Sequence, residues 1–222
     1  MTTTSPHRRL WLARHAQPLV APGVCYGALD LRADPAATAR SAQRLAAALP
    51  QRLSVWHSPL QRCELLAQAL IGLRPDLTLK SAPELVEFDF GHWEGRAWDD
   101  IARADIDAWT AQFAHYRPGG GDNLQEMLAR VASALRGAQQ ECAEGTDVLW
   151  ITHAGVARCV QWLLQAPPRA VPRAEPWPRS PPGYGLWVTF NPPAPVCTTC
   201  LSVSAAPHAP PHQTPIKDVK QP

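Results

Sequence analysis

The stretch RRLWLARHAQP, residues 8–18, decides how this chain folds. Its apolar run, residues 10–13, is too short for a helix and is flanked by charge, which is typical of a buried β-strand. Arg14 and His15 follow where this strand is expected to end. An open α/β sheet binds its ligands beyond the carboxyl ends of its strands. The pair is therefore placed for chemistry, because a guanidinium suits phosphate and an imidazole can attack or shuttle protons.

The composition is that of a globular protein whose charge is nearly balanced. The 222 residues are 45% hydrophobic and 18% charged, with a net charge of +2. They suffice for one sizeable domain and contain no basic stripe for nucleic acid. No apolar stretch approaches the length of a transmembrane helix, and charged residues interrupt the N-terminal apolar run too early for an export signal. We therefore expect a cytoplasmic protein that binds neither nucleic acid nor membrane.

Proline marks the expected end of the domain. The chain has 24 prolines, about twice the average usage. We expect a flexible N-terminus over residues 1–7, one domain over residues 8–191 and a proline-rich, disordered tail over residues 192–222. Of six scattered cysteines, Cys197 and Cys200 have CxxC spacing but lie in the tail. We interpret all six as reduced thiols rather than as a metal or redox site.

Strand and helix patterns alternate along the domain. Further strands are expected at residues 53–57, 148–152 and 185–190, with a short one from Thr78, and helices at 35–49, 98–113, 124–143 and 156–164. Another helix should follow residues 53–57, with Ser58 as its N-cap and Pro59 as its first residue. Asn123 and Glu126 match a capping box. The alternation predicts an α/β fold.

Three more chemically useful side chains, and two backbone N–H groups, are expected at the same edge of the sheet. Arg62 falls in the first turn of the helix after the second strand, and His153 ends the strand at 148–152. The acidic and aromatic loop at 84–95 supplies a carboxylate. The N–H groups of Ala154 and Gly155 open the next helix, where backbone donors and the helix dipole favour a bound anion.

Two histidines and a carboxylate could alternatively form a metal site. Arg14 and Arg62 argue against this, because guanidinium groups repel a divalent cation. Around a phosphoryl group, the two guanidinium groups would instead neutralise the negative oxygens, and each can donate two parallel hydrogen bonds to them.

Four motifs resemble, in order, those of the histidine phosphatase superfamily, also called the phosphoglycerate mutase-like family. They are LARHAQP (12–18), SPLQRC (58–63), ELVEFDFGHWEG (84–95) and ITHAG (151–155). The resemblance covers about residues 8–190 and implies a three-layer sandwich with a mostly parallel central sheet. It also implies a phosphatase that acts on a small phosphorylated metabolite and needs no metal or organic cofactor.

The resemblance further implies a role for each residue of the constellation. His15 is the nucleophile that becomes phosphorylated, and Arg14, Arg62 and His153 hold the phosphoryl oxygens, with Ala154 beside them. The family's catalytic carboxylate follows a leucine by two positions and precedes a glycine by four, which selects Glu87. We expect Gln17, Tyr26 and His92 at the substrate rim.

The chain departs from the family pattern just after His15. Ala16, Gln17 and Pro18 stand where most members have glycine, glutamate and serine or threonine, and Ala21 stands where many have a phosphate-contacting asparagine.

Within the family, EFDFGHWEG (87–95), IDAW (106–109) and GGGDNLQEMLARV (119–131) resemble the α-ribazole phosphatases of cobalamin synthesis. Three alternatives stay open: a broad-specificity phosphatase, a phosphoglycerate mutase-like phosphomutase, and a non-catalytic phosphate-binding module.

Overall fold

A five-stranded sheet in the order β3-β2-β4-β1-β5 forms the centre of the computed structural model. The structure describes residues 9–191 except 52, 144, 168, 169, 176 and 179. The expected N-terminal segment and the tail with its CxxC pair lie outside the described residues.

Four of the strands run parallel. They are β1 (Leu10–Arg14), β2 (Leu53–His57), β3 (Thr78–Ser81) and β4 (Asp147–Thr152). Strand β5 (Trp187–Phe190) pairs antiparallel with β1. The prediction of an α/β fold with a mostly parallel sheet is confirmed.

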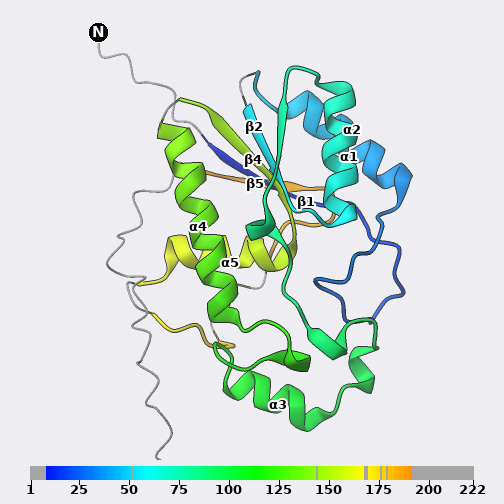
Figure 1. Ribbon diagram of the computed structural model, residues 1–222, viewed down its shortest axis with the longest axis vertical. Coiled ribbons are helices and arrows are strands. Elements are labelled where there is room, and N and C mark those ends of the chain that lie inside the picture. The colour runs from blue at the N-terminus through cyan, green and yellow to red at the C-terminus, as the bar shows by residue number, and fades with distance from the viewer. Residues whose placement is uncertain are drawn as a thin grey trace, which may run out of the picture.

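Helices cover both faces of the sheet (Figure 1). One layer contains α1 (Pro35–Ala48) and α2 (Gln61–Leu73), and the other contains α4 (Leu124–Ala143) and α5 (Ala154–Gln165). Successive strand side chains alternate between the layers, as the period of two requires. Thus Val148 and Trp150 of β4 pack with α4 and α5, whereas Leu149 and Ile151 pack with α1 and α2. The result is the expected three-layer sandwich.

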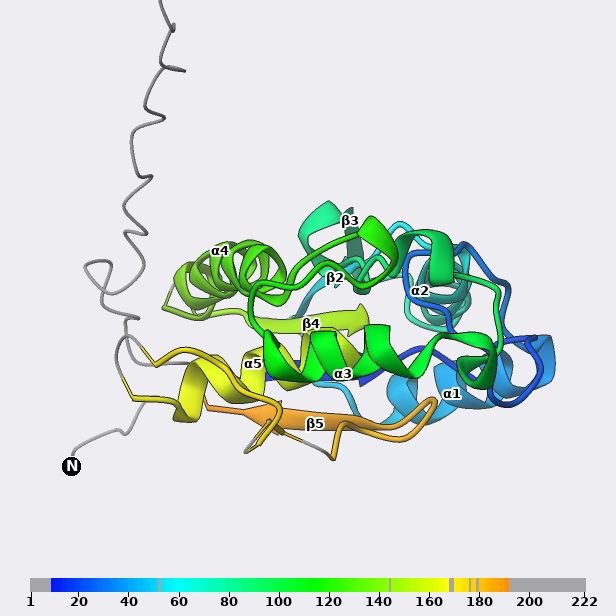
Figure 2. The same ribbon diagram turned by 90° about the horizontal axis from the view of Figure 1, so that it is seen from below.

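The segment between β3 and α4 covers one end of the sheet. It contains α3 (Arg103–Ala111) and four 3-10 turns, Pro83–Leu85, Gly91–Trp93, Trp98–Asp100 and Pro118–Gly120. Helix α3 crosses in front of the strands in Figure 2. A close crossing of Gly91 with Gly119 holds the segment together: both residues have positive φ, and a Cβ on Gly119 would lie 2.0 Å from the Phe90 carbonyl oxygen. Only glycine fits there.

The cap predicted for α2 was only partly right. The helix begins at Gln61, two residues later than expected. Asp30 accepts a hydrogen bond from the Gln61 amide at 2.7 Å, and the Ser58 hydroxyl accepts one from the Leu60 amide at 3.3 Å. The Ser58 amide instead bonds to the Ile151 carbonyl oxygen, which carries the chain one residue further along β4 before it turns. The Ser58 hydroxyl is buried there and binds His153. At α4 the cap was half right: Asn123 accepts a hydrogen bond from the Glu126 amide, but the Glu126 carboxylate pairs with Arg117.

Candidate active site

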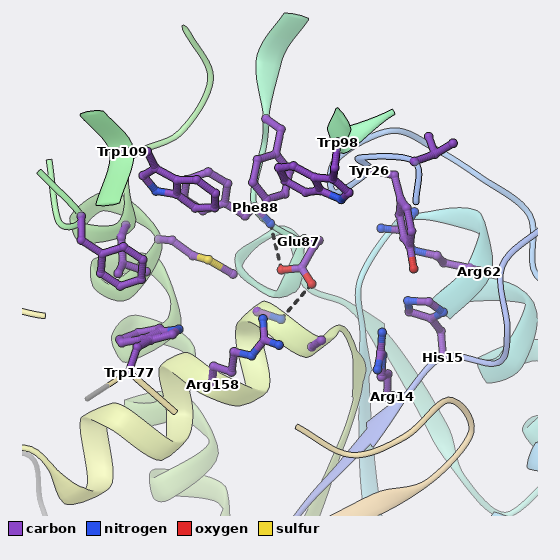
Figure 3. A pocket seen from close by; sticks show the side chains of 17 residues that line it. Arg14, His15, Tyr26, Arg62, Glu87, Phe88, Trp98, Trp109, Arg158 and Trp177 are labelled. Atoms are coloured by element: carbon purple, nitrogen blue, oxygen red, sulfur yellow. Dashed lines mark hydrogen bonds between the residues drawn. The ribbon is translucent and has the colours of Figure 1, made fainter. Parts of the chain in front are cut away.

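The carboxyl ends of β1, β2 and β4 open into one cavity of about 340 Å³ (Figure 3). Arg14, His15, Tyr26 and Arg62 line one end of it, and Glu87 lies between that end and a wall of aromatic side chains. Ala154 and Gly155, at the start of α5, also line the cavity. The structure therefore brings together most of the constellation expected from sequence.

His15 is held as a neutral imidazole, and its Nε2 has no hydrogen-bond partner among the described residues. Its side chain is buried, and Nδ1 lies 2.7 Å from the Ala16 carbonyl oxygen. A carbonyl oxygen only accepts, so Nδ1 carries the proton and Nε2 keeps its lone pair. Burial, and next the Arg62 guanidinium, lower the pKa of His15 from 6.5 to about 3. His15 is therefore a neutral imidazole, not an imidazolium, at neutral pH.

Arg14 offers an unsatisfied donor to the cavity. Its Nη1 donates to the Pro182 carbonyl oxygen at 3.2 Å, and its guanidinium lies 3.8 Å from the centre of the Tyr184 ring. Its Nε is buried without a hydrogen-bond partner among the described residues. A buried donor left unpaired is costly, so an anion in the cavity would satisfy it.

Arg62 is fully buried and fixed at three of its nitrogens. Nη1 donates to the Leu29 carbonyl oxygen at 2.8 Å, and Nη2 donates to the Gly27 carbonyl oxygen at 2.5 Å. Its Nε donates to Nδ1 of His153 at 3.3 Å. Each terminal nitrogen of a guanidinium carries two protons. One N–H on each therefore stays available to phosphoryl oxygens.

His153 lies behind His15 rather than on the cavity wall. The two rings are 5.1 Å apart, and His153 is fully buried. Because its Nδ1 accepts from Arg62, its proton is on Nε2, which donates to the Ser58 hydroxyl at 2.9 Å. Burial and the Arg62 charge hold the pKa of His153 well below its usual value. In this arrangement His153 orients Arg62.

The Glu87 carboxylate is fixed by two backbone amides. One oxygen accepts from the Phe88 amide at 3.0 Å and the other from the Gly155 amide at 2.8 Å. The sequence predicted that the N-terminus of α5 favours an anion. In the structure, the group that accepts from the Gly155 amide is the Glu87 carboxyl group.

Arg130 supports the Glu87 segment from behind and was not predicted from sequence. Its Nη1 donates to the carbonyl oxygens of Glu84 and Val86, and its Nη2 donates to that of Glu87. The second nitrogen also contacts Asp122. No local sequence pattern predicts these hydrogen bonds, because the acceptors are backbone oxygens of residues more than forty positions away.

The opposite end of the cavity is aromatic. Its walls are Phe88, Phe90, Trp98, Trp109, Phe113 and Trp177. Trp98 and Trp109 stack with their ring centres 6.4 Å apart. Arg158 of α5 also lines the cavity, and its Nε is buried without a hydrogen-bond partner among the described residues. Sequence reasoning missed Trp177 and Arg158, since neither belongs to a recognised motif.

Of the three residues expected at the substrate rim, only one lines the cavity. Tyr26 lines the cavity, whereas Gln17 and His92 are exposed and are not among its lining residues. Two positions where the chain departs from the family also lie away from it: Pro18 pairs with Ala33, and Ala21 is exposed.

The described residues show neither a metal cluster nor a membrane-spanning helix. They contain no group of three or more His, Cys, Asp or Glu side chains arranged to hold a metal ion. No helix among them is both long and apolar enough to cross a membrane.

Comparisons with known proteins identify a matching family and several relatives. The family model described as "Histidine phosphatase superfamily (branch 1)" matches residues 10–178. The adenosylcobalamin/alpha-ribazole phosphatase of Escherichia coli (strain K12) is 30% identical over 102 residues, which are 45% of this chain and 49% of that protein. The chain thus spans about half the length of this curated relative.

Two solved structures share the fold. The crystal structure of TTHB049 from Thermus thermophilus has a TM-score of 0.62 and 27% identity, covering 82% of this chain and 92% of that one. A structure described as phosphoglycerate mutase from the same organism has a TM-score of 0.57 and 30% identity, covering 71% and 84%.

Proposed function

Because the chain belongs to the histidine phosphatase superfamily, we propose that it is a phosphomonoester hydrolase that acts through a phosphohistidine on His15. The observation that carries the proposal is the state of His15. It is a neutral imidazole whose Nδ1–H is bound to Ala16, which leaves the Nε2 lone pair free to attack. Arg14 and Arg62 lie beside it to neutralise the phosphoryl oxygens.

The first step transfers the phosphoryl group to His15. Nε2 attacks phosphorus, forming an N–P bond as the bond from phosphorus to the leaving oxygen breaks. Glu87, in its protonated form, gives its proton to that oxygen, so the alcohol leaves neutral. The guanidinium groups stabilise charge on the equatorial oxygens.

The second step returns the enzyme to its starting state. The Glu87 carboxylate takes a proton from water while the water oxygen attacks phosphorus and the N–P bond breaks. Inorganic phosphate leaves, and His15 is again neutral. Two such transfers are each easier than direct attack by water.

The substrate we propose is α-ribazole 5′-phosphate or a similar phosphomonoester with a flat, apolar leaving group. The aromatic end of the cavity supports this choice, because ring stacking favours a planar aromatic group over a small polar acid. The named activity of the Escherichia coli relative points the same way. A phosphomutase is the second candidate, favoured by the 30% identity to the protein described as phosphoglycerate mutase.

Trapping the intermediate tests the mechanism. Brief reaction with ³²P-labelled phosphomonoester, quenched without acid, should leave alkali-stable label on the wild-type chain and none on His15→Ala. His115→Ala, at an exposed histidine, is the matched control and should keep the label. Full turnover in His15→Ala would overturn the proposed mechanism.

A panel of phosphomonoesters tests the substrate. We expect phosphate release to be fastest from α-ribazole phosphate. Equal rates on unrelated esters would indicate a broad-specificity enzyme. Phosphoryl transfer within a sugar acid, with little free phosphate, would indicate a mutase, and phosphate binding without turnover would indicate a binding module.

A further inference from the structure

Two tyrosines from opposite ends of the chain meet above the phosphoryl end of the cavity. The hydroxyl oxygens of Tyr26 and Tyr184 are 2.6 Å apart, although the residues are 158 positions apart in sequence. Tyr26 belongs to the loop after β1, and Tyr184 lies just before β5. This separation lies within the usual range for an O–H···O hydrogen bond.

Both rings contact residues of the phosphoryl site. The Tyr184 ring lies against the Arg14 guanidinium at 3.8 Å and is 5.6 Å from the His15 ring. The Tyr26 ring lies 5.7 Å from the Arg62 guanidinium. In Figure 3 the Tyr26 hydroxyl points toward the His15 side of the cavity. The pair therefore sits where a phosphoryl group would bind.

Counting protons leaves one donor unused. Two hydroxyls carry two protons, and the bond between them uses one. Among the described residues, neither hydroxyl has a further hydrogen-bond partner. Tyr26 lines the cavity and Tyr184 does not. The arrangement that satisfies both is Tyr184 donating to Tyr26, with the Tyr26 proton directed into the cavity.

We propose that the Tyr26 hydroxyl, polarised by Tyr184, is the neutral hydrogen-bond donor to the transferred phosphoryl group. This inference rests on the proposed phosphatase function. It also accounts for the departures after His15, since Pro18 and Ala21 supply no side-chain donor and neither lines the cavity. From the same loop, Tyr26 and Val24 line it instead.

The electrostatic surroundings suit a donor. Burial, together with the hydrogen bond to Tyr184, raises the pKa of Tyr26 above its ordinary value, so the hydroxyl keeps its proton. A hydroxyl that accepts one bond while donating another is polarised, which strengthens the donated bond.

Two variants, each lacking one hydroxyl oxygen, test whether Tyr26 donates to phosphate or whether the Tyr26–Tyr184 hydrogen bond only holds the two segments together. Tyr26→Phe removes the proposed donor, whereas Tyr184→Phe removes only its polarising partner. Binding of inorganic phosphate, measured by calorimetry on the full chain, should weaken about tenfold in Tyr26→Phe and only about two- to threefold in Tyr184→Phe. The double variant should bind like Tyr26→Phe. Tyr116→Phe, at the remaining tyrosine outside the cavity, is the control and should bind like wild type.

If the Tyr26–Tyr184 hydrogen bond only held the two segments together, the two single variants would behave alike, because each breaks that same bond. Equal losses of phosphate affinity in the two single variants, with equal falls in melting temperature, would overturn the proposal, as would unchanged affinity in Tyr26→Phe. Calorimetry needs no turnover. If the wild type bound phosphate through Tyr26 but hydrolysed no monoester, the proposed function would fail while the assignment of the donor would stand.

Discussion

The Gly155 amide donates a hydrogen bond to the Glu87 carboxyl group at 2.8 Å, and a side chain at Gly155 would collide with that group where it now lies. A Cβ there would lie 2.1 Å from Oε1 of Glu87. The first turn of α5 thus fixes the proposed acid, and the absence of a side chain is what permits it.

Gly155→Ala should therefore lower activity without lowering stability. Alanine favours a helix over glycine by up to about 1 kcal/mol, but its methyl group must displace Glu87. We expect kcat for an aryl phosphate to fall about a hundredfold, with the free energy of unfolding unchanged or raised. Gly72→Ala in α2, where nothing lies within 4 Å of the added Cβ, is the matched control. Full activity in Gly155→Ala would contradict the role given to this contact.

Arg130 should act as a positioning residue for Glu87. Arg130→Ala frees the carbonyl oxygens of residues 84, 86 and 87, so we expect kcat to fall about tenfold. Phosphate affinity should be unchanged, because Arg14 and Arg62 are undisturbed. Arg130→Lys should rescue little, since an ammonium lacks the planar fork. Parallel losses of kcat and phosphate affinity would argue for general disruption instead, and Arg103→Ala, at an exposed ion pair, serves as the control.

The buried neutral His15 should make stability depend on pH. Its pKa is about 3 when folded and 6.5 as a free side chain. Between these values the unfolded chain holds a proton that the folded chain does not, so the free energy of unfolding falls as the pH falls through this window. The loss at the acidic end is about 5 kcal/mol.

Urea unfolding at several pH values checks this dependence. His15→Asn cannot titrate there, so its stability should fall less steeply than that of the wild type, by up to about 1.4 kcal/mol per pH unit. His115→Asn should keep the wild-type slope. Identical slopes for wild type and His15→Asn would show that His15 is not buried in its neutral form.

The aromatic wall should determine preference for the leaving group. Trp109→Leu removes the ring that stacks with both Trp98 and Phe113. We expect kcat/KM for naphthyl phosphate to fall about tenfold. The same variant should hydrolyse glycerol 2-phosphate within about twofold of the wild-type rate, since that leaving group has no ring to stack. An equal loss of kcat/KM on both esters would show that Trp109 affects phosphoryl transfer rather than binding of the leaving group.

The sequence predicted those features that depend on interactions between residues close together in the chain. Short apolar runs and helical spacing placed β1, β2 and β4 and put Arg14, Arg62 and His153 near their ends, because strand and helix periodicities are carried by neighbouring residues. The helix expected to start at Pro59 begins instead at Gln61, because the Ser58 amide continues the pairing with β4 and the distant Asp30 carboxylate binds the first helical amide. Gln17 and His92 were expected at the rim from their neighbourhood alone, and both are exposed away from the cavity lining.

By itself, the sequence determined the layers of the fold, the strand ends that meet, and the chemistry gathered there. The tertiary structure decided which groups are free to act. It paired Gly155 with Glu87, Arg130 with the backbone of the acidic loop, and Tyr26 with Tyr184. These contacts join backbone groups and loop residues distant in the chain, and their geometry depends on the packed core. Such contacts produce no periodic pattern in the sequence, so they can be identified only in the folded structure.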